Sequence, residues 1–184
     1  MISDFYLKYK MESLIRFLSL NVGMKNNLAG LDALIKEHKF DVILLQEIRL
    51  SREDLDAKFS HLEYTSAVNI EEEDPSTPGT AVLWKSSLPV SNVIVLVKCR
   101  AQLVLLGNYA LLNIYAPSGS DKRNERAIFF SKEVFQGYTL HSQYIWIMGG
   151  DFNCLLNKLD VEDGIGFSQK RCTQLLDLEI LSMQ

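Results

Sequence analysis

The chain places a carboxylate and an amide two residues apart at the end of an apolar segment. Residues 145–154 read Ile-Trp-Ile-Met-Gly-Gly-Asp-Phe-Asn-Cys, so Asp151 and Asn153 follow a predicted strand and a glycine pair. Residues i and i+2 of an extended segment point the same way, and we expect these side chains to leave the strand end together. Such a pair can hold a water molecule or a phosphate. A tight turn is the alternative, because Gly, Asp and Asn all favour turns.

Three further polar residues stand at or just beyond the ends of other apolar segments. They are Asn21 in Leu-Ser-Leu-Asn-Val, Glu47 in Leu-Leu-Gln-Glu and Tyr115 in Asn-Ile-Tyr-Ala-Pro. The carboxyl ends of strands are where layered folds usually place their ligands. Each residue also has an ordinary structural explanation: Asn21 as a turn residue, Glu47 as a solvated loop residue and Tyr115 as a packed aromatic.

Taken together, these residue types favour a hard metal ion. Carboxylate and amide oxygens suit Mg²⁺ or Mn²⁺ and do not suit zinc. The three cysteines are far apart and form no Cys-x-x-Cys pair, and the chain has only three histidines, so a structural zinc site is not expected. Reduced thiols favour an intracellular protein of the nucleus or cytoplasm.

The elements that must position these residues follow from hydrophobic periodicity. Strands are predicted at 14–22, 41–45, 80–85, 92–98, 103–106, 109–115 and before Gly149. Helices are predicted around 28–35, from a Ser51 cap to about Phe59, over 121–135 with Ile128, Phe129 and Val134 as core positions, and over 168–178. Gly107-Asn108 between two apolar runs predicts a hairpin, and the charged, proline-containing segment 71–79 predicts a surface loop.

Composition limits the class of protein. With 184 residues, 47% of them hydrophobic, the chain can bury one sizeable core, and a single domain is the expectation. Its net charge of -4 gives no electrostatic footprint for nucleic acid, although a site that collects a cation must itself be acidic. No apolar run approaches the roughly 20 residues of a membrane helix, and no membrane partner is expected.

Five motifs occur in the order found in the endonuclease/exonuclease/phosphatase superfamily. They are Leu-Ser-Leu-Asn21-Val, Leu-Leu-Gln46-Glu47, Gly79-Thr-Ala-Val-Leu, Asn113-Ile-Tyr115-Ala-Pro and Gly150-Asp151-Phe152-Asn153. From about residue 15 onward the chain resembles this superfamily, and most closely the endonuclease domain of non-long-terminal-repeat retrotransposons. The resemblance implies an α/β (α+β) fold: a two-sheet β-sandwich flanked by helices, in the four-layer deoxyribonuclease-like arrangement. Residues 1–13 would be an N-terminal extension and 14–184 the family domain.

The resemblance also implies roles for the site residues. Glu47 would be the principal metal ligand with Asn21 beside it, and Tyr115 would contact the scissile phosphate. Asp151 would orient and deprotonate the attacking water and could also bind the metal, while Asn153 would hold the phosphate or that water. The implied activity is metal-dependent hydrolysis of DNA, of a retroelement type or an apurinic/apyrimidinic type.

The resemblance breaks after Asn153. The family completes its site with a late aspartate and a Ser-Asp-His triplet, whereas residues 154–184 contain no histidine and His141 comes too early. We therefore expect a domain that lacks its final strands, with impaired activity and an exposed sheet edge that could drive self-association. Ile48-Arg49 also departs from the retrotransposon pattern, although Arg49 could itself reach a phosphate.

Two other functions stay open. One is a catalytically inert remnant with at most a binding role, which the missing histidine favours. The other is an inositol or lipid phosphatase on the same scaffold. The acidic segment 71–74 argues against it, because lipid-directed members need membrane-contacting or basic loops.

Overall fold

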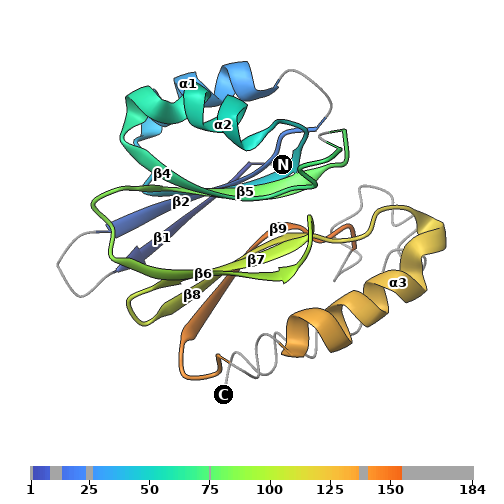
Figure 1. The fold of residues 1–184 in the computed structure, drawn as a ribbon. Helices are drawn as coiled ribbons and strands as arrows, with labels where there is room; N and C mark the ends of the chain where they lie inside the picture. The colour runs from blue at the N-terminus through green and yellow to red at the C-terminus, as the bar shows by residue number, and fades with distance from the viewer. Residues whose placement is uncertain (1, 9–13, 24–26, 75, 137–140, 155–184) are drawn as a thin grey trace, which may run out of the picture.

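Two β-sheets pack face to face, with helices on their outer faces (Figure 1). The computed structural model describes residues 2–8, 14–23, 27–74, 76–136 and 141–154. Helices α1 (Asn27–His38) and α2 (Arg52–Phe59) cover one sheet, and α3 (Arg123–Ile128) covers the other. The layers therefore run helix, sheet, sheet, helix. This arrangement confirms the predicted four-layer sandwich.

The first sheet has five strands within the described residues, in the order β1-β2-β3-β5-β4. These are β1 Ile2–Lys8, β2 Leu14–Asn21, β3 Val42–Ile48, β5 Gly79–Lys85 and β4 Tyr64–Asn69. Only β2 and β3 run parallel, with Asn21 opposite Gln46. The carboxyl ends of β2 and β3 consequently meet at one edge of the sheet.

The second sheet has the order β6-β7-β8-β9 in the part of the chain that the structure describes. Its strands are β6 Val90–Val97, β7 Ala101–Leu106, β8 Tyr109–Tyr115 and β9 Ile145–Asp151. Strands β8 and β9 are the parallel pair, with Tyr115 opposite Asp151. Each sheet thus contains one parallel pair, and the two pairs pack against each other across the sandwich.

Strand alternation divides the core into three apolar layers. Leu18, Leu20, Ile43 and Leu45 face α1 and α2. Residues one position away on the same strands lie between the sheets, among them Phe17, Val42 and Leu44 with Val104 and Leu111 of the second sheet. The outer face of the second sheet packs on the helical segment Phe129–Val134, which continues α3. This alternation fixes the register of β2 and of the first part of β3, because a one-residue slip would expose a whole apolar face.

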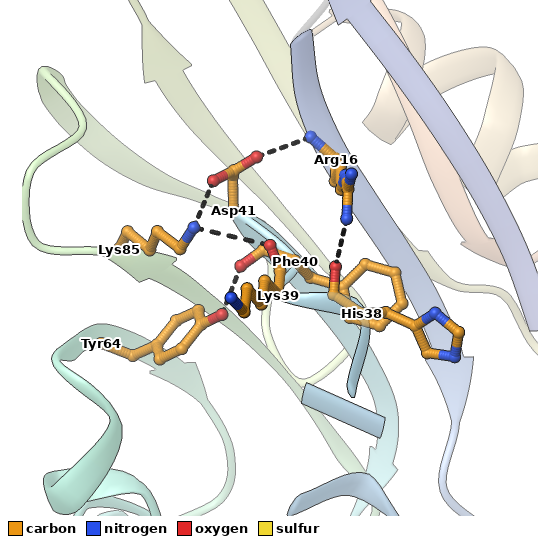
Figure 2. A network of polar contacts seen from close by, with 7 residues as sticks. All are labelled: Arg16, His38, Lys39, Phe40, Asp41, Tyr64 and Lys85. Atoms are coloured by element: carbon orange, nitrogen blue, oxygen red, sulfur yellow. Dashed lines mark hydrogen bonds and ion pairs between the residues drawn. The ribbon is translucent and has the colours of Figure 1, made fainter. Parts of the chain in front are cut away.

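The amino ends of β2 and β3 are tied together by a network centred on Asp41, which Figure 2 shows. Asp41 Oδ2 accepts the backbone N–H of Arg16 at 2.8 Å, and Oδ1 accepts Lys85 Nζ at 2.7 Å. Arg16 Nη1 in turn donates to the carbonyl of His38, the last residue of α1, at 2.8 Å. These bonds lock β2, β3 and β5 together at the end opposite the parallel strands' carboxyl termini.

Most predicted elements are confirmed. Helix α2 begins where expected, with Ser51 Oγ accepting the N–H of Asp54 at 3.1 Å. The Gly107-Asn108 turn joins β7 to β8, and Gly107 has a φ of 57°, which suits glycine in a hairpin turn. The helix predicted over 168–178 and the expected absence of final strands concern positions outside the described residues.

Three elements differ from the predictions. Strand β1 pairs with β2, so residues of the expected N-terminal extension contribute to the first sheet. Strand β4 was not predicted because it lies at the end of the sheet order and is mostly polar or half-buried. The prediction of Ile128 as a core residue was wrong, since its side chain is 51% exposed. Arg126, Phe129, Phe130 and Val134 form the buried stripe, and Ile128 lies off it by helical geometry.

Within the described residues, no helix is both long enough and apolar enough to cross a membrane.

Candidate active site

Four of the five predicted site residues meet where the two parallel strand pairs end. Asn21 ends β2, Glu47 lies near the end of β3, Tyr115 ends β8 and Asp151 ends β9. Two hydrogen bonds join them across the sandwich: Asn21 Nδ2 donates to Asp151 Oδ2 at 2.7 Å, and Tyr115 Oη donates to Glu47 Oε1 at 2.8 Å. Residues up to 130 positions apart in sequence thus form one cluster.

Glu47 reaches this cluster because the backbone of β3 is irregular at that point. Strict alternation would turn Glu47 to the helix-covered face with Leu45. A bulge between Gln46 and Ile48 in the pairing with β5 reverses the phase, so that Ile48 takes the helix side. Glu47 has a φ of 58°, in the left-handed region that non-glycine residues rarely occupy. Bulges and strained residues of this kind recur at functional sites, where they re-aim a side chain.

The amide of Asn21 has both ends fixed. Its Oδ1 accepts the N–H of Gly23 at 2.9 Å, and its Nδ2 binds Asp151. A Cβ built on Gly23 would lie 4.0 Å from Asn21 Oδ1 and 4.0 Å from Glu47 Oε2. The amide oxygen and the free carboxylate oxygen therefore face the same small region.

Asp151 is held by two donors, but Asn153 is not arranged as predicted. Asp151 Oδ1 accepts the backbone N–H of Asn153 at 3.0 Å, which forms a tight turn. Asn153 has a φ of 48°, and its Nδ2 donates to the carbonyl of Ala116 at 2.8 Å. The expectation of two side chains leaving an extended strand in parallel was thus wrong, because the strand ends at Asp151. Asn153 nevertheless stays beside Asp151 through the turn.

Tyr115 is buried, and two effects keep its phenol protonated. Burial raises the pKa of Tyr115 most, because it penalises the charged phenolate, and the hydrogen bond to the Glu47 carboxylate raises it further. Tyr115 is therefore a hydrogen-bond donor at neutral pH. It donates to a carboxylate here and could donate equally to a phosphate oxygen.

A buried amide pair beneath the site sets the distance between the sheets. Gln46 Nε2 donates to Asn113 Oδ1 at 2.7 Å, and Asn113 Nδ2 donates to the carbonyls of Leu45 and Ala81 at 3.0 and 2.9 Å. The sequence analysis quoted Gln46 and Asn113 only as letters of motifs. Their types were a usable signal, since an amide inside an apolar strand must find a partner when buried.

The oxygen donors present fit a magnesium or manganese ion. Glu47 Oε2 and the second lone pair of Asn21 Oδ1 have no protein partner among the residues that the structure describes. Mg²⁺ is commonly held by one or two carboxylates, with waters and substrate phosphates completing its shell. The described ranges contain no group of three or more His, Cys, Asp or Glu side chains placed to hold a metal ion.

Solved structures with the same fold include proteins that are nucleases by name. An AP endonuclease from Archaeoglobus fulgidus superposes with a TM-score of 0.73 at 14% identity, covering 92% of this chain and 70% of that one. The AP endonuclease LMAP from Leishmania major superposes with a TM-score of 0.67 at 16% identity, covering 91% of this chain and 66% of that one. A 3′-5′ exonuclease from Neisseria meningitidis superposes with a TM-score of 0.70 at 14% identity, covering 84% of this chain and 66% of that one. At these identities the likeness establishes the fold, and the chain spans about two thirds of each relative.

The family is established by sequence as well. Among curated proteins, a sequence search finds no match. The family model described as "Endonuclease/Exonuclease/phosphatase family" matches residues 18–167, which is most of the chain and includes all five predicted site residues. The chain therefore belongs to the endonuclease/exonuclease/phosphatase family.

Proposed function

We propose that the chain is a divalent-metal-dependent phosphodiesterase that hydrolyses DNA. The observation that carries the proposal is the pair of hydrogen bonds Asn21–Asp151 and Tyr115–Glu47, which unites two carboxylates, an amide and a phenol from both sheets. Such a set can bind a cation, activate water and donate to an anion. Membership of the family and the nuclease names of similar structures support a phosphodiester substrate.

Glu47 and Asn21 would hold the metal ion, through Oε2 and Oδ1. Once bound, the ion would neutralise charge on the phosphate oxygens and help to orient the substrate. The chain's own contribution is the fixed direction of these oxygens: the bulge aims Glu47, and Gly23 with Asp151 holds the amide of Asn21. Fixed donors avoid the cost of reorganisation during the reaction.

Asp151 would accept the proton of the attacking water. Its two oxygens are oriented by Asn21 Nδ2 and by the N–H of Asn153, and each retains a lone pair for a water molecule. The second proton of Asn153 Nδ2 would hold that water or the phosphate. Tyr115, protonated for the reasons given above, would donate to a phosphate oxygen where negative charge develops.

The substrate could be intact or damaged DNA. The resemblance to the endonuclease domain of non-long-terminal-repeat retrotransposons supports a retroelement-type endonuclease, which would nick intact duplex. The likeness to AP endonucleases supports cleavage beside an abasic site. Supercoiled plasmid and a short duplex with one abasic site separate the two, because only the first enzyme type needs no lesion.

The proposal is tested by incubating the chain with supercoiled plasmid and with the abasic duplex, in Mg²⁺ and in chelator. We expect metal-dependent nicking that falls by about 10²–10⁴-fold in Asp151→Asn, the range for loss of a general base. Glu133→Gln, a change of the same kind on an exposed residue of the helical turn after α3, is the matched control. Equal nicking by parent and Asp151→Asn would refute the assignment.

A second candidate is binding of DNA without hydrolysis. It is favoured by the absence of histidine from residues 154–184, since family members use one on the phosphate. A folded chain that shifts the duplex in a binding assay but leaves both substrates uncut with Mg²⁺ or Mn²⁺ would establish this candidate instead.

A further inference from the structure

Arg100 lies beside the site with its charge uncompensated. Its guanidinium carbon is 4.8 Å from the centre of the Tyr115 ring, so the planar cation covers one face of the phenol. The side chain is half-buried, and it forms no ion pair with any carboxylate of the described residues. Its Nη1 makes only long contacts to the carbonyls of Tyr115 and Ala116, at 3.5 and 3.4 Å.

The turn that carries Arg100 is held by a buried amide. Asn69, at the end of β4, accepts the N–H of Cys99 at 2.8 Å and donates to the carbonyl of Val97 at 2.9 Å. Cys99 has a φ of 61°, a conformation that the surrounding bonds must enforce. The carbonyl of Arg100 also accepts the N–H of Tyr115 at 2.7 Å. The position of Arg100 relative to the site is therefore fixed by the fold.

Arg126, in the same region, has a structural role and serves as a comparison for Arg100. Arg126 is 2% exposed, and its Nη1 donates to the carbonyls of Pro117 and Gly119 at 2.9 and 2.6 Å. Its short bonds close the loop after β8. Within the described residues Arg100 has no comparable bonds, and most of its five N–H donors have no protein partner there.

We propose that Arg100 binds a DNA phosphate next to the scissile one, over the face of Tyr115. A guanidinium presents donors in a planar fork that matches a phosphate and can take it through two bonds. The scissile phosphate would lie at the Glu47–Tyr115 edge of the ring. A guanidinium on the ring's face is displaced to one side of that edge, toward a neighbouring phosphate on the same strand. This inference rests on the proposed substrate, but its test does not need hydrolysis.

The test measures binding of a short fluorescent duplex by anisotropy in chelator, with Arg100→Gln, Arg100→Lys and Lys132→Gln. Lys132 is exposed on the helical turn after α3 and provides a control with the same loss of charge. We expect Arg100→Gln to weaken binding about tenfold and to lower the slope of log affinity against log salt by about 0.9, the value for one phosphate contact. Arg100→Lys should keep the slope but lose part of the affinity, since it loses the fork.

A set of duplexes with one neutral methylphosphonate each locates the contact. At one position the neutral linkage should weaken binding by the parent and leave Arg100→Gln unaffected, which a merely structural arginine would not produce. Binding by Arg100→Gln that equals that of the parent and of Lys132→Gln would overturn the proposal, as would equal sensitivity of parent and variant at every position.

Failure of this inference is distinguishable from failure of the proposed function. If Arg100→Gln binds and nicks as the parent does, the Arg100 assignment fails while the phosphodiesterase stands. If the parent does not nick but the methylphosphonate pattern appears, the hydrolytic function fails and Arg100 stands. A parent chain that does not bind the duplex at all overturns the Arg100 assignment.

Discussion

Asp41 and Glu47 stand at the two ends of β3, and their surroundings differ in almost every respect. Asp41 binds Lys85 Nζ and the N–H of Arg16, and its own N–H and carbonyl are also paired. Figure 2 shows how this network closes around the carboxylate. Glu47 has a left-handed backbone and accepts a phenol on one oxygen, and no protein cation pairs with it in the described ranges.

We attribute this difference to function: Asp41 stabilises the fold, whereas Glu47 is the residue that we propose binds the metal ion. Asp41 has its charge neutralised by the protein itself, so its contribution goes into stability. Glu47 keeps its charge and its strained backbone, which lower stability unless something binds there. Functional sites commonly show this exchange of stability for activity. Substitutions at the two ends of β3 should therefore differ in their effects on nicking and on stability.

The largest effect is expected at the site end, from Glu47→Gln. Nicking should fall by about 10²–10⁴-fold, because a ligand of the ion is lost while the shape is retained. Stability without metal should stay within about 0.5 kcal/mol of the parent or rise, since an uncompensated charge is removed. Mg²⁺ at 100 times its Kd should stabilise the parent by about 2.7 kcal/mol but not the variant, as read by thermal melting.

The same melting experiment on an Asp41 variant is the control. Mg²⁺ should stabilise Asp41→Ala as much as the parent. A metal-induced shift of equal size in Glu47→Gln would show that the ion does not bind through Glu47.

The next effect is expected between the sheets, from Asn113→Ala. The change removes three buried hydrogen bonds, those to Gln46 Nε2 and to the carbonyls of Leu45 and Ala81. Gln46 Nε2 keeps its longer bonds to Ser19 Oγ and to the carbonyl of Leu44, at 3.3 and 3.1 Å. At about 1 kcal/mol for each lost bond, the free energy of unfolding should fall by about 3 kcal/mol. Urea denaturation measures this, with exposed Gln136→Ala as the matched amide control. A loss below about 1 kcal/mol would mean that the amide pair does not set the spacing of the sheets.

A smaller effect is expected at the folding end, from Asp41→Ala. Loss of its bonds to Arg16 and Lys85 should lower the free energy of unfolding by about 1–2 kcal/mol, since the pair is only partly shielded from water. Nicking well below the melting temperature should be unchanged. Lost nicking in a fully folded Asp41→Ala chain would remove the contrast between the two ends of β3.

The sequence was informative about this contrast only in part. Asn21, Glu47, Tyr115 and Asp151 could be predicted because their signal is local: a polar residue closes an apolar run. The bulge at Glu47 and the turn at Asn153 could not, since both depend on how the neighbouring strand or loop is bonded.

The contacts between residues that are far apart in the sequence could not be predicted from the sequence either. Gln46 and Asn113 are 67 residues apart, and Arg100 meets Tyr115 only through the stacking of a side chain on a ring. Nothing local distinguishes Arg100, for which we propose a phosphate ligand, from Arg126, whose side chain bonds to the carbonyls of Pro117 and Gly119. Strand β4 escaped prediction for another reason: at the end of the sheet order, polar side chains replace the apolar alternation that marks a buried strand.

The smallest effect is a pH dependence of stability at the folding end, from Tyr64. Tyr64, which donates to the carbonyl of Phe40, has a pKa raised to about 12, chiefly by burial and then by the negative charge of Asp41. The folded state therefore keeps this proton between the ordinary value near 10 and 12, where the unfolded chain has released it. The stabilisation is complete below pH 10 and is lost as the pH rises toward 12.

Tyr64→Phe should thus flatten the fall in urea midpoint between pH 10 and 12, measured against the parent. Tyr115→Phe provides the comparison from the site end, because the pKa of Tyr115 is raised too, through burial and Glu47. The two tyrosines differ in the carboxylate that helps to raise the pKa, which is Asp41 for Tyr64 and Glu47 for Tyr115. Asp41→Ala should reduce the Tyr64 effect and leave the Tyr115 effect intact, whereas Glu47→Gln should do the reverse. If either carboxylate substitution changed both effects alike, the two ends of β3 would be coupled, and the division between a folding end and a ligand end would not hold.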